Sequence, residues 1–329
     1  MSYIAVLGAG SWGSTLAKLL AEKDYDVSLW VHEEDLAREI SQTGVNSVFL
    51  PGVELPRSLK ASADFERVLR GSRYVVSVVP TQFVRSVMRV ARPHIERNAV
   101  VVSASKGIEN KTFQTVTSIV HEMTGLPAAA LSGPSFASEV VRRLPTAVTL
   151  ACRDRNVGLL LQELFTTDYF RVYTHHDVIG TELGGALKNV MAVAAGISEG
   201  LGLGSNARAA LITRGLMEMT RLGVCMGAEE KTFFGLSGLG DLVLTCTSTQ
   251  SRNYTVGRRL GQGEKLKEIL ASMTAVAEGV STTRAAHALA TKKRVEMPIV
   301  EQVHAVLYEE KDPREAVTAL MTRLPKAEF

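Results

Sequence analysis

Short apolar runs alternate with helical patterns along the chain up to about Thr174. Several of these runs are almost continuously apolar, which is typical of strands buried on both faces of a parallel sheet. Alternating strands and helices predict an α/β domain, a Rossmann-type doubly wound sheet with right-handed crossovers. The helical patterns include Asp64–Leu69, Phe83–Ala91 and Thr112–Met123. The expected strands are Ile4–Leu7, Val27–Val31, Tyr74–Val79, Val100–Ser103, Ala129–Leu131, Thr146–Ala151 and Phe170–Tyr173.

From about Val178 the strand signals fade and long helical periodicities replace them. We therefore predict two domains, a dinucleotide-binding Rossmann-like domain at residues 1–178 and an all-helical, substrate-binding C-terminal domain at residues 179–329. The stretch Leu183–Ser198 is apolar but too short to span a bilayer, so it is expected to be a buried helix. The other helical patterns are Arg208–Leu222, Tyr254–Leu260, Leu266–Leu270, Thr282–Ala290 and Ile299–Leu307, the last with Pro298 as its first residue.

Composition is that of an ordinary globular protein of two-domain size. The chain has 329 residues, with 46% hydrophobic and 22% charged residues and a net charge of +3. Its dense basic run, Lys292-Lys293-Arg294, is interpreted as a solvated helix end, so no nucleic-acid partner is expected. No membrane insertion is expected, because the apolar stretch Leu183–Ser198 is too short. Cys152, Cys225 and Cys246 lie far apart and are expected to be reduced core thiols. With no signal-peptide pattern at the start, a cytoplasmic location is expected.

The first strand leads directly into a glycine-rich turn of the form G-x-G-x-x-G, followed at once by a helical pattern. In a strand–turn–helix context, Gly8 permits the tight turn, Gly10 lets the backbone approach a pyrophosphate, and Gly13 allows the helix to pack closely on the strand. The helix N-terminus then presents free N–H groups to the phosphates. A nicotinamide dinucleotide site is therefore predicted.

The second strand bears on the choice between NAD and NADP. NAD-preferring domains usually end this strand with an acidic residue that holds the ribose 2′-hydroxyl. Here His32 lies at or near that place, with Glu33 and Glu34 after it. A histidine would not repel a 2′-phosphate, although no arginine stands beside it. The sequence favours NADP, or the use of both coenzymes. The seven histidines show no metal-ligand spacing, so catalysis without a metal is expected.

Lys188 is the one charged residue between Glu182 and Glu199. Burial disfavours the charged form of an ammonium group, which suits a lysine to proton transfer near neutral pH. The alternative is a lysine that extends from the end of a core helix to solvent. Its position in the middle of the run favours a functional role.

Two turns at the carboxyl ends of expected strands carry further candidates. Lys106 follows Val100–Ser103, and Gly133-Pro134-Ser135 follows Ala129–Leu131. Ligands bind at such strand ends in doubly wound folds. A solvated loop lysine and a plain turn remain the alternatives for these two sites.

A second polar cluster lies in the helical half. Asp241 could accept a hydrogen bond from Lys188 or could cap a helix. Ser251, Arg252 and Asn253 precede a helical run, where orphan N–H groups and a bidentate guanidinium would suit a phosphate group. The alternative is that Ser251 only caps that helix.

Taken together, these segments resemble the bacterial NAD(P)-dependent sn-glycerol-3-phosphate dehydrogenase family, in order over nearly the whole chain. The resemblance implies reversible reduction of dihydroxyacetone phosphate to sn-glycerol 3-phosphate, which supplies the glycerol backbone of phospholipids. The matching stretches are Gly8–Gly13, Phe49-Leu50-Pro51, Val79-Pro80-Thr81, Ser105-Lys106-Gly107, Ser132–Ala137, Gly184–Val190, Asn206–Gly215, Gly238–Thr247 and Gln250–Asn253.

The resemblance also implies residue roles. Lys188 would be the general acid in ketone reduction and the base in the reverse direction. Lys106 would contact substrate and cofactor, and Asp241 would lie near the reacting end. The substrate would be held by Gly133, Ser135, Ser251, Arg252 and Asn253. The dinucleotide would be contacted by Gly8, Gly10, Ser11, Trp12, Gly13, His32, Ala137, Val276 and Glu278, and by Arg252 as well.

Two other functions fit parts of the pattern. One is a related two-domain hydroxy-acid dehydrogenase, and the other is a non-catalytic module that senses NADP. An isolated lysine in an apolar helix argues against a sensor, because a sensor does not need a buried proton donor. A small phosphate-bearing substrate is the expected partner, and the helical domain is expected to form a homodimer.

Overall fold

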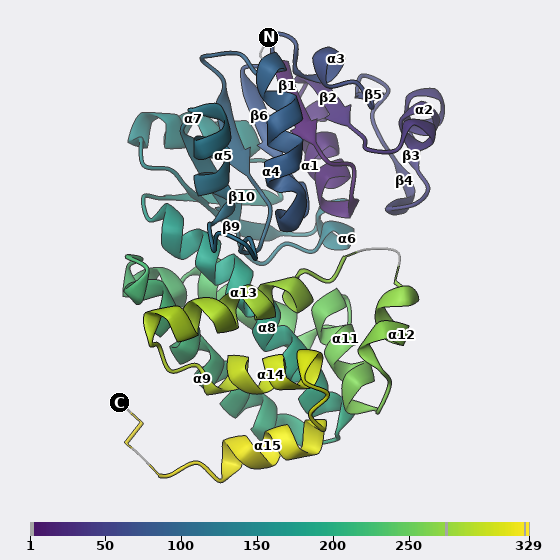
Figure 1. The fold of residues 1–329 in the computed structure, drawn as a ribbon. Coiled ribbons are helices and arrows are strands. Elements are labelled where there is room, and N and C mark those ends of the chain that lie inside the picture. The colour runs from purple at the N-terminus through teal and green to yellow at the C-terminus, as the bar shows by residue number, and fades with distance from the viewer. Residues whose placement is uncertain (1–2, 274–275, 326, 329) are drawn as a thin grey trace. The chain divides into compact units, whose positions relative to one another are not determined.

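The computed structural model describes residues 3–273, 276–325 and 327–328. Its internal contacts divide the chain into two compact units (Figure 1). Unit 1 comprises Met1–Gly107 and Gln114–Glu182, and unit 2 comprises Ile108–Phe113 and Leu183–Phe329. The chain therefore passes from one unit to the other three times, the last time within helix α8 (Val178–Gly200).

Unit 1 contains an eight-stranded sheet. The strands are β1 (Tyr3–Leu7), β2 (Asp26–Trp30), β5 (Lys60–Ser62), β6 (Tyr74–Ser77), β7 (Val100–Ser103), β8 (Ala128–Ser132), β9 (Thr146–Ala151) and β10 (Phe170–His175). They pair in the order β10-β9-β8-β7-β6-β1-β2-β5. Strands β5 to β8 run parallel to β1 and β2, whereas β9 pairs antiparallel with β8. An apolar run indicates burial but not direction, so the reversal at β9 was not predicted.

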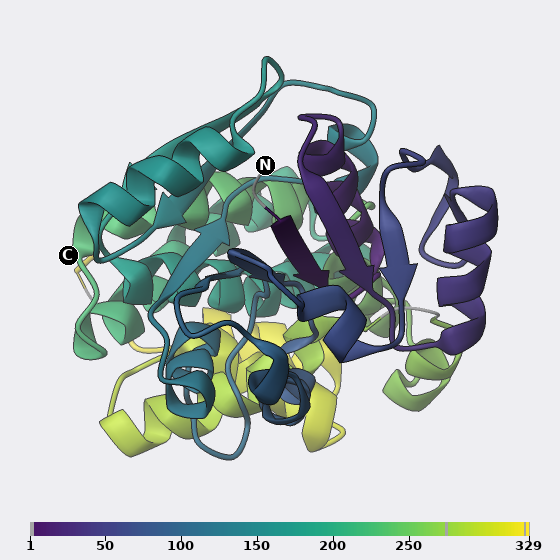
Figure 2. The same ribbon diagram turned by 90° about the horizontal axis from the view of Figure 1, so that it is seen from above.

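Helices cover both faces of this sheet, as the view from above shows (Figure 2). One face packs its apolar residues against α1 (Ser11–Ala21), α2 (Glu34–Thr43) and α7 (Arg155–Phe165). The other packs against α3 (Phe65–Leu69), α4 (Thr81–Ala91) and α5 (Val116–Thr124). The central strands are buried from both sides, as their continuous apolar runs predicted. The doubly wound fold class is confirmed.

Several elements of unit 1 differ from the sequence-based expectation. A small antiparallel hairpin, β3 (Val45–Asn46) and β4 (Leu50–Glu54), and the edge strand β5 were not predicted. Helix α5 begins four residues later than expected, at Val116. The remaining elements are the 3-10 helix η1 (Arg92–His94) and the short helix α6 (Ala137–Val140).

Unit 2 is helical in the part that the structure describes. Pro298 is the first residue of its helix, as predicted. Residues 183–198 of α8 are buried throughout, which confirms the expected core helix. The elements after α8 are α9 (Gly204–Cys225), the 3-10 helix η2 (Glu230–Phe234), the π-helix η3 (Leu236–Gly240), α10 (Asp241–Thr247), α11 (Arg252–Gly261), α12 (Leu266–Ala271), α13 (Glu278–Lys293), α14 (Pro298–Tyr308) and α15 (Pro313–Met321).

Two further expectations can be compared with the structure. The three cysteines are free thiols, but only Cys246 belongs to the core, since Cys152 is half-buried and Cys225 is exposed at the end of α9. The basic run at the end of α13 is exposed, as predicted. Across residues 3–273, 276–325 and 327–328, no helix combines the length and the apolar character needed to cross a bilayer.

Candidate active site

The glycine loop, Gly8–Gly13, connects β1 to α1 and has no room for side chains at its first and last positions. Gly8 has a φ of +110°, and a Cβ there would lie 3.0 Å from the carbonyl oxygen of Val78. A Cβ at Gly13 would lie 1.8 Å from the carbonyl oxygen of Gly8. A Cβ at Gly10 would meet nothing within 4 Å, so this side of the loop is open. The three glycines thus have the tight turn, the open face and the close helix contact that the motif requires.

The open side of the loop is also the start of α1. Gly10 is the N-cap residue, and no side chain caps the helix there. The first N–H groups of a helix have no partners within the helix, and the helix dipole makes this end positive. A pyrophosphate would satisfy both features, so the loop fits the phosphates of a dinucleotide. Ser11 and Trp12, two of the predicted cofactor residues, lie in this first turn.

Hydrogen bonds connect the turns that follow three neighbouring strands of unit 1. Ser105, after β7, donates a hydrogen bond to the carbonyl oxygen of Val79, after β6, at 2.6 Å. The Nζ atom of Lys106 lies 3.0 Å from the carbonyl oxygen of Gly133, after β8. The Ser135 hydroxyl donates to the same carbonyl oxygen at 3.0 Å. The structure therefore brings Lys106 to Gly133 and Ser135, which the sequence placed in a different turn.

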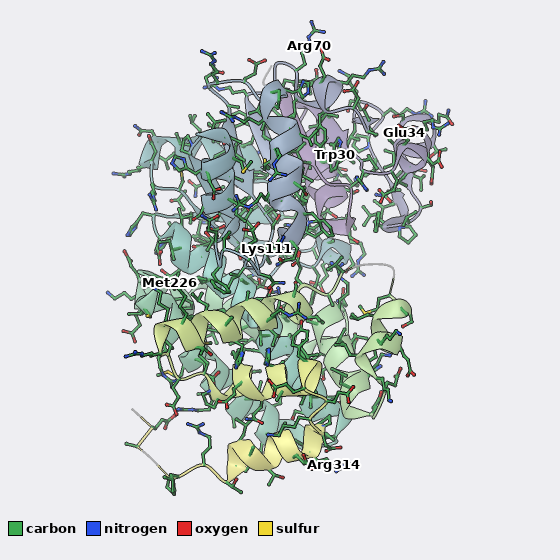
Figure 3. The ribbon with its side chains drawn as sticks, in the orientation of Figure 1. Trp30, Glu34, Arg70, Lys111, Met226 and Arg314 are labelled. Atoms are coloured by element: carbon green, nitrogen blue, oxygen red, sulfur yellow. The ribbon has the colours of Figure 1, made fainter. Side chains whose placement is uncertain are left out.

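The other predicted dinucleotide residues of unit 1 lie near its first strands and helices. Trp30 ends β2, and Glu34 begins α2 (Figure 3). His32 lies between them, exposed, with its ring 5.8 Å from the Trp30 ring. Ala137 is the first residue of α6, a helix that contacts α1. The exposed imidazole leaves the end of β2 without a carboxylate at position 32.

In unit 2, Lys188 lies inside the core rather than at its surface. Its side chain is 8% exposed, and Nζ donates to Asp241 Oδ1 at 2.9 Å and to Thr245 Oγ1 at 2.7 Å. The Thr245 hydroxyl in turn donates to the main-chain carbonyl of Asp241 at 2.6 Å. Asp241 is the first residue of α10, and the hydrogen bond expected between its carboxylate and Lys188 is present. Two hydrogen-bond acceptors thus hold the ammonium group, a satisfied arrangement for a buried charge.

Asn189, the residue after Lys188, takes part in contacts that join three helices of unit 2. Asn253 Nδ2 on α11 donates to Asn189 Oδ1 at 2.9 Å, and the N–H of Gly279 on α13 donates to Asn253 Oδ1 at 2.9 Å. A Cβ at Gly279 would lie 2.6 Å from the Asn189 carbonyl oxygen, so only glycine fits this contact. Asn253, predicted to bind substrate, therefore has its side-chain amide engaged in linking α8, α11 and α13.

The remaining predicted residues of unit 2 lie around the start of α11 and α13. Ser251 is 4% exposed and accepts a hydrogen bond from the N–H of Tyr254. It therefore caps α11, which was the alternative to a phosphate-binding role. Arg252 is the first residue of α11 and is exposed, and Glu278 is the first residue of α13. Val276 is 50% exposed just before that helix. Arg252 precedes Asn253 in the chain and Glu278 precedes Gly279, so a cation and a carboxylate flank the hydrogen bond between Gly279 and Asn253.

Glycines set the position of α11 against α8. A Cβ at Gly196 would lie 2.1 Å from the carbonyl oxygen of Tyr254, and one at Gly257 would lie 2.0 Å from that of Val193. One turn further along, a Cβ at Gly200 would lie 2.2 Å from the carbonyl oxygen of Arg258, and one at Gly261 would lie 2.5 Å from that of Ile197. The two backbones touch directly, so the start of α11 has a fixed place relative to Lys188 on α8.

Cys246 lies next to the Lys188 cluster but is not suited to act as a nucleophile. It is fully buried, and burial raises the pKa of its thiol to about 12. Because the thiolate is the reactive form, this cysteine is an inert core side chain at neutral pH.

Sequence reasoning did not single out Asn189 or Thr245 as partners of the predicted residues. Thr245 follows Asp241 by four residues, a spacing that places both side chains on one face of a helix. That spacing was a usable signal. Asn189 gave no such signal, because its partner Asn253 is 64 residues away.

A dinucleotide-binding loop, a lysine at the strand ends and a buried lysine in a helical unit define a nicotinamide-dependent dehydrogenase of the two-domain type. Two family models, described as the N-terminus and the C-terminus of NAD-dependent glycerol-3-phosphate dehydrogenase, match residues 3–158 and 177–318. The chain belongs to this family of oxidoreductases, which act on a CH–OH group with NAD or NADP as coenzyme.

Individual relatives agree over almost the full length. The glycerol-3-phosphate dehydrogenase (NAD(P)+) of Geobacter sp. strain M21 is 57% identical, covering 99% of this chain and 98% of the relative. The solved structure of the Coxiella burnetii glycerol-3-phosphate dehydrogenase is 44% identical, with a TM-score of 0.95, and covers 98% and 99% of the two chains. The corresponding structure from Saccharomyces cerevisiae is 30% identical, with a TM-score of 0.84, over 96% and 98%. These relatives do not favour a hydroxy-acid dehydrogenase or a sensing module.

Proposed function

We propose that the chain reduces dihydroxyacetone phosphate to sn-glycerol 3-phosphate with NADH or NADPH, reversibly, and so supplies the glycerol backbone of phospholipids. The observation that carries the proposal is the buried Lys188, held by Asp241 and Thr245. Family membership supports the same reaction. When bound, the reduced nicotinamide supplies a hydride to the carbonyl carbon.

Lys188 is proposed to act as the general acid of the reduction. As the carbonyl carbon gains a hydride, its oxygen gains negative charge and must take up a proton. An ammonium group buried among hydrogen-bond acceptors can deliver that proton and take it back in the reverse direction. Asp241 and Thr245 fix the direction of Nζ, so each serves as a positioning group for this transfer.

The other predicted residues are proposed to bind and orient the substrate. Lys106 adds positive charge near the reacting oxygen, and Arg252 at the start of α11 binds the substrate phosphate as a bidentate donor. Gly133, Ser135, Ser251 and Asn253 complete the predicted substrate set. Binding energy from a dianionic phosphate, remote from the carbonyl, can then be used to hold the carbonyl in place.

The coenzyme is proposed to be NADP in preference to NAD, with both accepted. The support is His32, an exposed imidazole at the end of β2 where NAD-specific domains carry a carboxylate. The remaining dinucleotide contacts are proposed to come from the glycine loop, Lys106, Ala137, Arg252, Val276 and Glu278.

The test is oxidation of NADPH and of NADH, followed at 340 nm with dihydroxyacetone phosphate, by the wild type, Lys188→Ala and the exposed control Lys292→Ala. We expect Lys188→Ala to lower kcat by at least about a hundredfold while coenzyme affinity stays within about twofold, because the proton donor alone is lost. The control should match the wild type. Coenzyme binding without turnover in the wild type would refute the substrate assignment, and full activity in Lys188→Ala would refute its role.

We further propose a homodimer in the cytoplasm. Unit 2 contains an apolar groove of about 550 Å³ between α8, α9, α14 and α15. Exposed Leu203, Met321 and Leu324 are among the residues that line it, and exposed apolar patches of this kind often mark interfaces. A second copy of the chain is the proposed occupant, because one surface that pairs with itself gives a closed two-fold dimer. Light scattering should give twice the chain mass, and Met321→Glu should lower it; a monomeric wild type would refute the dimer.

A further inference from the structure

Asn46 is a fully buried polar residue next to the glycine loop that the proposed reaction does not use. It ends β3, and its side chain has no exposed surface. Its Nδ2 atom donates to the carbonyl oxygen of Ala9 at 2.8 Å and to Ser14 Oγ at 2.9 Å. Its Oδ1 atom accepts the N–H of Phe49 at 2.9 Å. One side chain therefore connects the β3–β4 hairpin to the glycine loop and to the first turn of α1.

The bond to Ala9 bears on the peptide at the centre of the loop. In a planar trans peptide the carbonyl group of one residue and the N–H of the next point in opposite directions. Since Asn46 holds the Ala9 carbonyl on the buried side, the N–H of Gly10 must point to the open side. In the described part of the chain, this N–H donates to no other backbone group. Its direction is thus set by the two donors that hold the Ala9 carbonyl, the Asn46 amide and the Ser14 hydroxyl, and Asn46 also donates to that hydroxyl.

A second contact joins the same two segments. Ser11 Oγ donates to the carbonyl oxygen of Phe49 at 2.6 Å. Within the loop and the start of α1, Ser14 Oγ also donates to the carbonyl oxygen of Ala9, at 3.1 Å. The hairpin itself is anchored, because Leu50 is 6% exposed within the main apolar cluster of unit 1. Asn46 therefore acts from a fixed support rather than from a mobile loop.

We propose that Asn46 is a positioning residue for coenzyme binding, which orients the Ala9–Gly10 peptide so that the Gly10 N–H faces the pyrophosphate. The proposal rests on the proposed dinucleotide site but not on the identity of the substrate. Preorganised donors bind an anion without the cost of ordering the loop at the moment of binding. Without the hydrogen bond from Asn46, the Ala9–Gly10 peptide must be ordered each time the coenzyme binds.

Two substitutions remove the hydrogen bond from Asn46 to Ala9 in different ways. Asn46→Asp keeps an acceptor for the Phe49 N–H but replaces the Nδ2 donor with an oxygen that faces the Ala9 carbonyl. Asn46→Ala removes donor and acceptor without adding a charge. A matched control is Gln162→Glu, because Gln162 Nε2 also donates to a carbonyl oxygen of unit 1, that of Val172 at 2.7 Å, but on α7 and β10.

The readout is the Kd of NADPH, NADH and ADP-ribose, measured by calorimetry on the full chain, together with thermal stability. We expect both Asn46 variants to raise each Kd about tenfold, as loss of one buried hydrogen bond predicts. The kcat at saturating coenzyme should stay within about twofold of the wild type, because Asn46 does not contact the reacting atoms. Gln162→Glu should lose some stability with its Kd values unchanged.

The outcomes separate this proposal from the proposed reaction. Unchanged Kd values in folded Asn46 variants, or an equal rise in Gln162→Glu, would overturn the positioning role. Loss of the folded state in both Asn46 variants would make Asn46 a structural residue and overturn it as well. A wild type that binds NADPH but does not reduce dihydroxyacetone phosphate would refute the substrate while leaving the effect of Asn46 measurable.

Discussion

Replacing Gly257 by alanine tests the direct contact between α8 and α11. The new Cβ would lie 2.0 Å from the Val193 carbonyl oxygen, against about 3.4 Å for ordinary contact. The opposing atom belongs to a helix backbone, so the two helices must separate by about 1.4 Å or bend. A matched substitution is Gly158→Ala in α7, whose Cβ would meet only the Cys152 side chain, at 3.5 Å.

Both substitutions remove a glycine from a helix, which alone favours folding by about 1 kcal/mol. Gly257→Ala adds the cost of overpacking, about 1–3 kcal/mol and near the upper end because backbone must move. We therefore expect Gly158→Ala to be neutral or stabilising. Gly257→Ala should be less stable than Gly158→Ala by about 1–3 kcal/mol, the overpacking cost alone.

Urea unfolding followed by circular dichroism measures this difference, and the KM for dihydroxyacetone phosphate measures its effect on the site. Because α11 starts at Arg252 and Asn253, we expect the KM to rise in Gly257→Ala and to stay unchanged in Gly158→Ala. Equal stability of the two variants would refute the reasoning that the backbone contact fixes α11. A large loss of stability without a change in KM would refute its link to the substrate site.

Three further predictions concern single side chains. Burial raises the pKa of Glu218 to about 7 from 4.5, so the folded protein holds this proton more tightly than the unfolded chain, and stability is lost as the pH rises between those values. Urea unfolding should show that the unfolding free energy falls from pH 5 to pH 8 by up to about 3 kcal/mol less in Glu218→Gln than in the wild type. An equal fall in both proteins would contradict this. Lys23 donates to the carbonyl oxygens of Glu163, Leu164 and Thr166 and so caps the end of α7. Lys23→Met should therefore lower the unfolding free energy by about 1–2 kcal/mol. An unchanged melting temperature would argue against this capping role. Arg252→Ala should raise the KM for dihydroxyacetone phosphate about tenfold or more with partial rescue by Arg252→Lys, and an unchanged KM in steady-state assays would remove its phosphate role.

The sequence predicts best where one physical signal is strong and local. Continuous apolar runs located the buried strands β1, β6 and β7, and the glycine pattern located the turn into α1. Strand β4 gave no signal, because it contains Pro51 and Gly52 and is mostly exposed. Nor could an apolar run reveal that β9 is antiparallel to β8, since burial does not encode direction.

For the site, residue types were predictable, and so was the pairing of Lys188 with Asp241, but most other partners were not. Lys188 stood out as an isolated charge in an apolar helix. Its partner Asp241 lies 53 residues away, so their hydrogen bond became definite only with the fold. Asn46 shows the reverse case, because nothing local to it indicates that its amide holds the Ala9 carbonyl. Such long-range bonds depend on packing that no spacing rule describes.

The segment Ile108–Phe113 belongs to unit 2, although the chain on both sides of it belongs to unit 1. Lys292 on α13 lies over the Phe113 ring, with Nζ 5.7 Å from its centroid. A fragment that starts at Leu183 would therefore lack part of its own helical unit. Chimaeras that exchange coenzyme or substrate preference between relatives should transplant these six residues together with the C-terminal half, since a single crossover point would join mismatched surfaces.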